Sequence, residues 1–132
     1  MKEREVPAPA VNPETVRFWQ AAQEGTFLVK RCGSCGDAHF YPRSLCPFCF
    51  SENTSWEPIS GEGVVYSFSV IRQSASPYVL AYVTLREGPT VLSNIVTDQP
   101  NDLQIGDKVG LTFRPSKEGQ SVPMFEPKVR SG

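Results

Sequence analysis

Two cysteine pairs decide the fold of this chain: residues 32–35 read CGSC and residues 46–49 read CPFC. Ten residues separate the two C-x2-C pairs. Each pair can form one tight knuckle that delivers two thiolates, and two knuckles can close a tetrahedron around one metal ion at about 2.3 Å. The spacing therefore predicts a rubredoxin-like zinc ribbon whose four metal ligands are Cys32, Cys35, Cys46 and Cys49.

The sequence around the two knuckles differs. Gly36 follows the first pair, and glycine readily adopts the left-handed conformation that turns backbone N–H groups toward the sulfurs. Phe50 occupies the equivalent position after the second pair, and Pro47 stiffens that turn. We therefore expect the second knuckle to be less regular. Residues 27–31 and 41–45 lead into the two knuckles as hairpin arms.

Four cysteine ligands leave zinc no open coordination position, so the site is expected to be structural and not catalytic. Two alternatives stay open, because paired thiols can also serve redox chemistry or form disulfides, and an all-sulfur tetrahedron also suits iron and electron transfer. His39 lies between the knuckles. With four thiolates already present, we expect it to be a surface or packing residue.

The N-terminal part, residues 1–25, contains a predicted flexible arm to about Ala10 and then a helix. Asn12 can cap free N–H groups, and Pro13 fits the first helical position. The helix should run for about three turns and end at Gly25, so it must dock to be stable. Phe18 and Trp19 lie near its apolar face, and we expect them to pack on the next module, with anchoring of a partner protein as the alternative.

Residues 59–132 follow the ribbon of residues 26–58 and consist of alternating strand patterns. Five strands are predicted over residues 64–71, 78–85, 90–96, 108–113 and 121–129. In the first of these, alternation places Val64, Tyr66, Phe68 and Val70 on one face. Pro123 and Pro127 suggest that the last strand lies at an edge. The long link before Ile105 favours a five-stranded OB barrel, which makes the chain mainly β.

The charge balance excludes some partners. The 132 residues carry 13 Lys+Arg and 14 Asp+Glu, a formal net charge of −1, and no segment is basic. Proteins that bind nucleic acid by counterion release carry a basic face, so this partner is disfavoured. The sequence contains no run of about 18 apolar residues, so no membrane span is predicted. The first residues lack the apolar core of a signal peptide, which favours a cytoplasmic location.

No motif for catalysis is found in the sequence. G-x-S-x-G, a phosphate-binding glycine loop and H-E-x-x-H are all missing. The single histidine, His39, falls within the ribbon, and Asp98 and Asp102 lie in a stretch rich in Pro and Asn that is typical of a solvated turn. We therefore expect the chain to have no catalytic residues of its own.

The order of helix, four-cysteine ribbon and barrel resembles the zinc-ribbon/OB-fold family of accessory proteins that accompany thiolases and act with acyl-CoA. The resemblance covers nearly the whole chain, from about Asn12 to Val129. It rests on the joint order of short motifs. These motifs are FW at 18–19, RCGSCG at 31–36, YPR at 41–43, CPFC at 46–49, SGEGVVYSF at 60–68, LREG at 85–88, IGDKV at 105–109 and PMFEP at 123–127.

The resemblance implies a structural zinc ion and a partner that is a thiolase-like or acyltransferase subunit, with the CoA thioester as a ligand shared between the two proteins. No short motif carries over the CoA contacts, and Thr90 stands where similar sequences often have a basic residue. Arg43, Arg72 and Lys108 are candidates for phosphate contacts, with solvated surface charge as the alternative. A nucleic-acid-binding ribbon and OB module remains the competing function.

Overall fold

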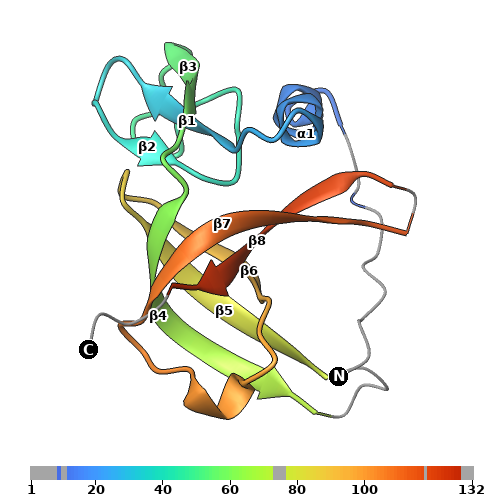
Figure 1. The fold of residues 1–132 in the computed structure, drawn as a ribbon. Coiled ribbons are helices and arrows are strands. Elements are labelled where there is room, and N and C mark those ends of the chain that lie inside the picture. The colour runs from blue at the N-terminus through green and yellow to red at the C-terminus, as the bar shows by residue number, and fades with distance from the viewer. Residues whose placement is uncertain (1–8, 10–11, 73–76, 118, 129–132) are drawn as a thin grey trace.

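The computed structural model of the protein describes residue 9 and residues 12–72, 77–117 and 119–128. A small sheet and a short helix sit on one side of a barrel (Figure 1). The predicted flexible arm lies almost entirely outside the described residues, as does the predicted end of the last strand at Val129. In the described part of the chain, no helix has the length and apolar character needed to cross a bilayer.

Helix α1 spans Val16–Gln23 and is shorter than predicted. Residues 13–15 form a turn in front of it, because the Asn12 side chain accepts a hydrogen bond from the Glu14 N–H at 3.0 Å and Thr15 becomes the N-cap. Phe18 and Trp19 are buried, which confirms the packing prediction for both. Gln23 also bonds the backbone of Ser121 at 2.8 Å and so ties the helix to the barrel.

The ribbon contains a three-stranded antiparallel sheet in the order β2-β1-β3. Its strands are β1 (Leu28–Cys32), β2 (Ala38–His39) and β3 (Thr54–Pro58). Strand β1 leads directly into the first knuckle, as predicted. The Arg31 guanidinium pairs with the Glu57 carboxylate across β1 and β3, and Lys30 lies over the Trp56 ring at 4.4 Å from its centroid.

The remaining strands close into a barrel in the order β4-β5-β6-β8-β7. They are β4 (Glu62–Ile71), β5 (Tyr78–Leu85), β6 (Thr90–Ile95), β7 (Lys108–Pro115) and β8 (Ser121–Pro127). The 3-10 turn η1 (Pro100–Asp102) precedes β7. The strand boundaries agree closely with the sequence prediction, and the strand order is that of an OB barrel.

The prediction that the last strand lies at a sheet edge is wrong. Strand β8 pairs along its length with β7 and meets β6 in parallel at Ile95 and Phe125. Prolines are tolerated because the contact with β6 is short. Moreover, the Ser93 hydroxyl donates a hydrogen bond to the Pro123 carbonyl at 3.0 Å, so this carbonyl has a partner from β6.

The prediction that Val64, Tyr66, Phe68 and Val70 share one face is also wrong. A β-bulge between Val65 and Ser67 shifts the register, so that Val65 points inward before the bulge and Phe68 after it. Tyr66 is 59% exposed and Val64 41% exposed. Alternation by two residues holds on each side of a bulge but not across it.

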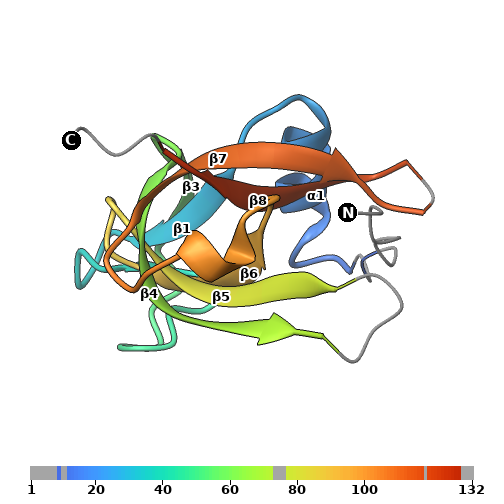
Figure 2. The same cartoon turned by 60° about the horizontal axis from the view of Figure 1, so that its bottom comes forward.

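One continuous apolar core joins helix, ribbon and barrel. The Phe27 ring makes the connection, since its centroid lies 5.4 Å from Phe18, 5.3 Å from Phe40 and 6.5 Å from Phe125 of β8. Figure 2 shows α1 and β1 packed behind the β7–β8 side of the barrel. The position of the ribbon is therefore fixed by the same core that fills the barrel.

Candidate metal centre and adjoining cleft

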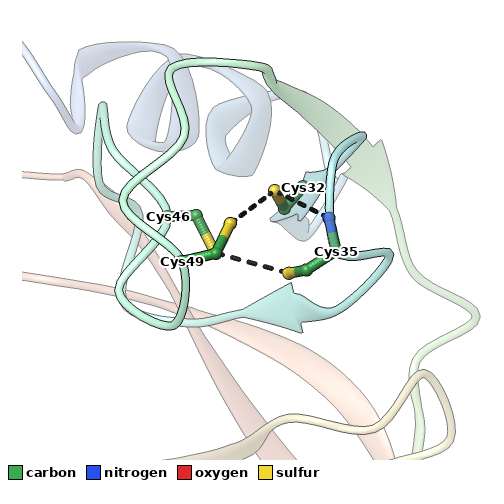
Figure 3. A group of neighbouring side chains, drawn as sticks. All are labelled: Cys32, Cys35, Cys46 and Cys49. Atoms are coloured by element: carbon green, nitrogen blue, oxygen red, sulfur yellow. Dashed lines mark hydrogen bonds between the residues drawn. The ribbon is translucent and has the colours of Figure 1, made fainter.

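The four predicted ligand residues converge on one point. The Sγ atoms of Cys32, Cys35, Cys46 and Cys49 all lie within 4.8 Å of one another (Figure 3). Sγ of Cys32 is 3.6 Å from that of Cys49, and Sγ of Cys35 is 3.7 Å from that of Cys46. Each of these short distances is between a cysteine of the first knuckle and a cysteine of the second, so the cluster connects the two knuckles.

The two knuckles close with the same turn, so the second is more regular at this point than the sequence suggested. The Gly36 N–H donates to the Cys32 carbonyl at 2.9 Å, and the Phe50 N–H donates to the Cys46 carbonyl at 2.8 Å. Gly36 has φ +82° and Phe50 has φ +62°. Phe50 thus adopts the left-handed conformation that costs a non-glycine residue about 1–2 kcal/mol.

The sulfur geometry fits a four-coordinate metal ion. A tetrahedron with metal–sulfur bonds of 2.3 Å has sulfur–sulfur edges of about 3.8 Å, close to the 3.6 and 3.7 Å observed. Backbone N–H groups of Ser34 and Cys35 both point at Sγ of Cys32, each at 3.4 Å. Such donors stabilise a thiolate, and the first knuckle is therefore arranged for a charged sulfur.

The thiols are unequal before a metal binds. Hydrogen bonds from the backbone of Cys35 and then Ser34 lower the pKa of Cys32 to about 6. The Asp37 N–H favours the Cys35 thiolate, yet burial and the neighbouring sulfurs outweigh it and raise the pKa of Cys35 to about 12. Four sulfurs so close together cannot all be charged without a cation among them, which again favours a bound metal ion.

One contact at the centre had no signal in the sequence. The hydroxyls of Ser34 and Ser51 lie 2.8 Å apart and join the two knuckles beside the cysteines. Serines are common in turns, so nothing in the pattern singled out this pair.

A cleft of about 380 Å³ adjoins the metal centre, between the ribbon and the turn that joins β5 to β6. Arg43, Phe48 and Thr90 line it together with His39. His39 is 3% exposed, and neither ring nitrogen has a hydrogen-bond partner. Burial lowers the pKa of His39, so its imidazole is neutral at pH 7. His39 is therefore a packing residue of the ribbon and lies beside the cleft.

The three basic candidates for phosphate contact do not gather in one place. Arg43 borders the cleft. Lys108 pairs with Val64 near the start of β4, whereas Arg72 follows the other end of β4 and donates to Asn101 at 2.7 Å. Eight residues of extended chain separate these two positions along β4, about 26 Å. One diphosphate therefore cannot contact both Lys108 and Arg72.

Comparison with known protein families matches two adjoining parts of the chain. Residues 19–55 match the ChsH2 rubredoxin-like zinc ribbon domain. Residues 56–114 match the ChsH2 C-terminal OB-fold domain. The two matches follow one another without a gap, in the order in which the structure shows the ribbon and the barrel.

Curated relatives carry several descriptions. The chain is 38% identical to a DUF35 domain-containing scaffold protein of Methanocaldococcus jannaschii, over 78% of this chain and 79% of that protein. It is 33% identical to the benzoylsuccinyl-CoA thiolase subunit BbsA of Thauera aromatica, over 76% and 72%. A probable enoyl-CoA hydratase alpha subunit of Thermomonospora curvata is 30% identical over 93% of this chain, which spans 40% of that protein's length.

A solved structure has the same fold at comparable identity. A chain of the Ltp2–ChsH2(DUF35) aldolase superposes with a TM-score of 0.83 and 30% sequence identity, over 92% of this chain and 100% of that chain. The similarity therefore extends over ribbon and barrel together and includes their relative placement.

Proposed function

The chain belongs to the ChsH2 (DUF35) family of zinc-ribbon and OB-fold proteins, and from this premise we propose that it is an accessory subunit of a thiolase-type enzyme that acts on acyl-CoA. In this role it contributes no catalytic residue. It stabilises the complex and forms part of the wall around the CoA thioester.

The observation that carries the proposal is the match over ribbon and barrel to a chain of an aldolase complex, at a TM-score of 0.83. The relative from Thauera, described as a thiolase subunit, supports the same class of partner. The chemistry of the chain agrees with this role. Its four thiols form the candidate metal site, and its histidine is buried in the ribbon.

We infer a structural zinc ion at the four cysteines, because the matched family domain is a zinc ribbon. The residues that would hold it are Cys32, Cys35, Cys46 and Cys49, which leave no position for water or substrate. When bound, the ion supplies a cross-link between the knuckles and keeps all four sulfurs as thiolates. The chain's own residues then position Phe48 and Arg43 at the cleft.

The cleft is the part of this chain best suited to touch the CoA thioester. Arg43 can offer a positive charge and Thr90 a hydroxyl, on walls that are otherwise largely apolar. A narrow channel with such walls can hold the long pantetheine arm and exclude water. The CoA would lie between this chain and the enzyme subunit.

Isolation of the tagged chain from the organism that encodes it, at native expression level, tests the proposal. We expect a thiolase-type subunit to co-elute at fixed stoichiometry and to be identified by mass spectrometry. Recovery of the chain alone, with no detectable binding of acetyl-CoA or a longer acyl-CoA, would contradict the proposal. Salt-sensitive binding of single-stranded oligonucleotides would favour the competing nucleic-acid function instead.

A further inference from the structure

Among the residues that the structure describes, the outer face of the first three barrel strands carries one charged side chain, Glu62 at the start of β4, which pairs with Arg86. The strand register places the following residues on it: Val64, Tyr66, Ser67 and Ser69 from β4, Leu80, Tyr82 and Thr84 from β5, and Thr90, Leu92 and Asn94 from β6. None of these positions, all in the described part of the chain, is Asp, Glu, Lys or Arg. Half of these positions are Ser, Thr or Asn, and the others are Val64, Tyr66, Leu80, Tyr82 and Leu92. These positions are therefore partly polar but carry no charge.

A row of large side chains crosses this face. Tyr82 of β5 pairs directly with Leu92 of β6, and Tyr66 stands at the bulge of β4 beside them. Their exposed fractions are 49%, 52% and 59% for Tyr82, Leu92 and Tyr66. Tyr66 follows the inward Val65 and faces outward, and the bulge places Ser67 outward beside it, so that the residues from Phe68 onward have the opposite facing to that of an unbroken alternation.

The second knuckle extends the same surface. Phe48 lines the cleft opposite Thr90, and Thr90 stands on the outer face two residues before Leu92. Phe48 is 62% exposed and Phe50 is 75% exposed. Phe50 also has φ +62°, a backbone conformation that glycine adopts without the steric strain of a side chain. An exposed phenyl ring that packs little within the chain at a strained position points to a contact outside the chain.

We propose that the outer face of β4, β5 and β6, together with Phe48 and Phe50 of the second knuckle, is the surface that docks the enzyme subunit. This inference rests on the proposed function and adds to it where the partner binds. The combined surface is called the docking face below. The partner is a folded protein that presents an apolar, uncharged patch to Tyr66, Tyr82 and Leu92.

The charge of the docking face argues for a protein partner. OB barrels that bind oligonucleotides use the outer face of their second and third strands, here β5 and β6, with aromatic rings inside a basic groove. Tyr82 supplies the ring, but no Lys or Arg stands among the outward positions of these two strands that the structure describes. Interface cores between proteins are depleted in charge and enriched in tyrosine, as this face is.

The size of the face agrees with including the knuckle. Three strands about 4.8 Å apart and about 26 Å long have a flat footprint of roughly 370 Å². A stable interface buries about 800 Å² of accessible surface on each partner. A docking face that also includes the cleft and the knuckle tip offers the partner a larger area than the barrel strands alone.

Binding of variants to the enzyme subunit identified with the wild-type chain tests the docking face. Leu92→Glu places a charge in its centre and should weaken the dissociation constant, measured by titration calorimetry, by about tenfold or more. Phe50→Gly should weaken binding as well, while the melting temperature stays equal or rises. Val16→Glu is the matched control, because Val16 is 41% exposed but lies on α1, which packs on β8 and β1. It should bind as the wild type does.

The outcomes separate the two proposals. If wild type binds the enzyme subunit and both Leu92→Glu and Phe50→Gly bind it equally well, the docking face is wrong and the proposed function stands. If wild type binds no such subunit, the proposed function fails, and this inference fails with it.

Two further measurements on the isolated chain can overturn the choice of partner. Sedimentation as a dimer that Leu92→Glu dissolves would assign the face to a second copy, and binding of an oligo-dT probe that Leu92→Glu abolishes would assign it to nucleic acid.

Discussion

The barrel and the ribbon are both built from antiparallel strands, but different interactions hold them. The barrel interior is filled by side chains at most 4% exposed, among them Val83, Leu85 and Phe125. From residue 33 to residue 58, the buried positions are His39, Pro42 and Cys46. The ribbon has too little apolar surface of its own to fold, so its second knuckle must depend on the cysteine cluster. Packing therefore maintains the barrel and the first ribbon strand, whose Leu28 and Val29 belong to the same core, whereas the two knuckles depend on a metal ion.

The largest expected effect comes from Cys46→Ser, which removes one buried ligand. Metal binding contributes on the order of 10 kcal/mol to small zinc domains, and most of it should be lost from the ribbon. We expect elemental analysis to find less than one zinc per chain, and hydrogen exchange to show the ribbon unprotected while β5 stays protected.

Ser34→Ala is the matched control for Cys46→Ser. It removes the hydroxyl contact with Ser51 beside the cluster but leaves all four thiolates, so it should keep one zinc. One full equivalent of zinc in Cys46→Ser would show that the ligand set is wrong. A coloured wild-type protein with iron in place of zinc would favour electron transfer.

The second effect lies in the barrel. Leu85→Ala removes a side chain that is 2% exposed and should lower the free energy of unfolding by about 2–5 kcal/mol, with zinc content unchanged. Leu92→Ala on the neighbouring strand, 52% exposed, should change it by less than about 1 kcal/mol. Urea denaturation followed by circular dichroism measures both. Loss of zinc in Leu85→Ala would mean that the two parts do not differ as described.

The smallest effect concerns pH. Burial lowers the pKa of His39 in the folded chain below its unfolded value of about 6.5. Between these two values the unfolded chain binds a proton that the folded chain does not, so the stability from neutral His39 is present above about pH 6.5 and lost as pH falls. The melting temperature should fall less between pH 7 and pH 5 in His39→Gln than in wild type. An equal fall in melting temperature in the two proteins would show that burial of His39 does not contribute to the pH dependence of stability.

The sequence predicted much of this because the relevant signals are local. The C-x2-C spacing located the knuckles, and alternation of apolar residues located all five barrel strands almost to the residue. The face of Tyr66 could not be predicted, because one inserted residue at a bulge leaves no mark in the pattern. The turn at Phe50 was misjudged because the knuckle imposes φ +62° against the preference of the residue.

The cleft and the docking face escaped sequence analysis for a different reason. They depend on contacts between distant segments, such as Phe48 with Thr90 across the cleft and Tyr66 beside Tyr82. Likewise, the sequence placed β8 in the barrel but could not predict its pairing with β6, which rests on Ile95 and Phe125. Such pairings follow from topology and not from the local pattern.

The proposed function is that of a subunit that supports an acyl-CoA enzyme without performing its chemistry. The most direct measurement is thioester consumption, followed by ultraviolet absorbance, for the chain alone, for its thiolase-type partner alone and for the two together. We predict no turnover by this chain, and turnover by the partner that rises when the chain is added and saturates at the stoichiometry of the complex. Thioester consumption by the chain alone would contradict the proposed function. So would a rate of consumption by the partner that does not change when the chain is added.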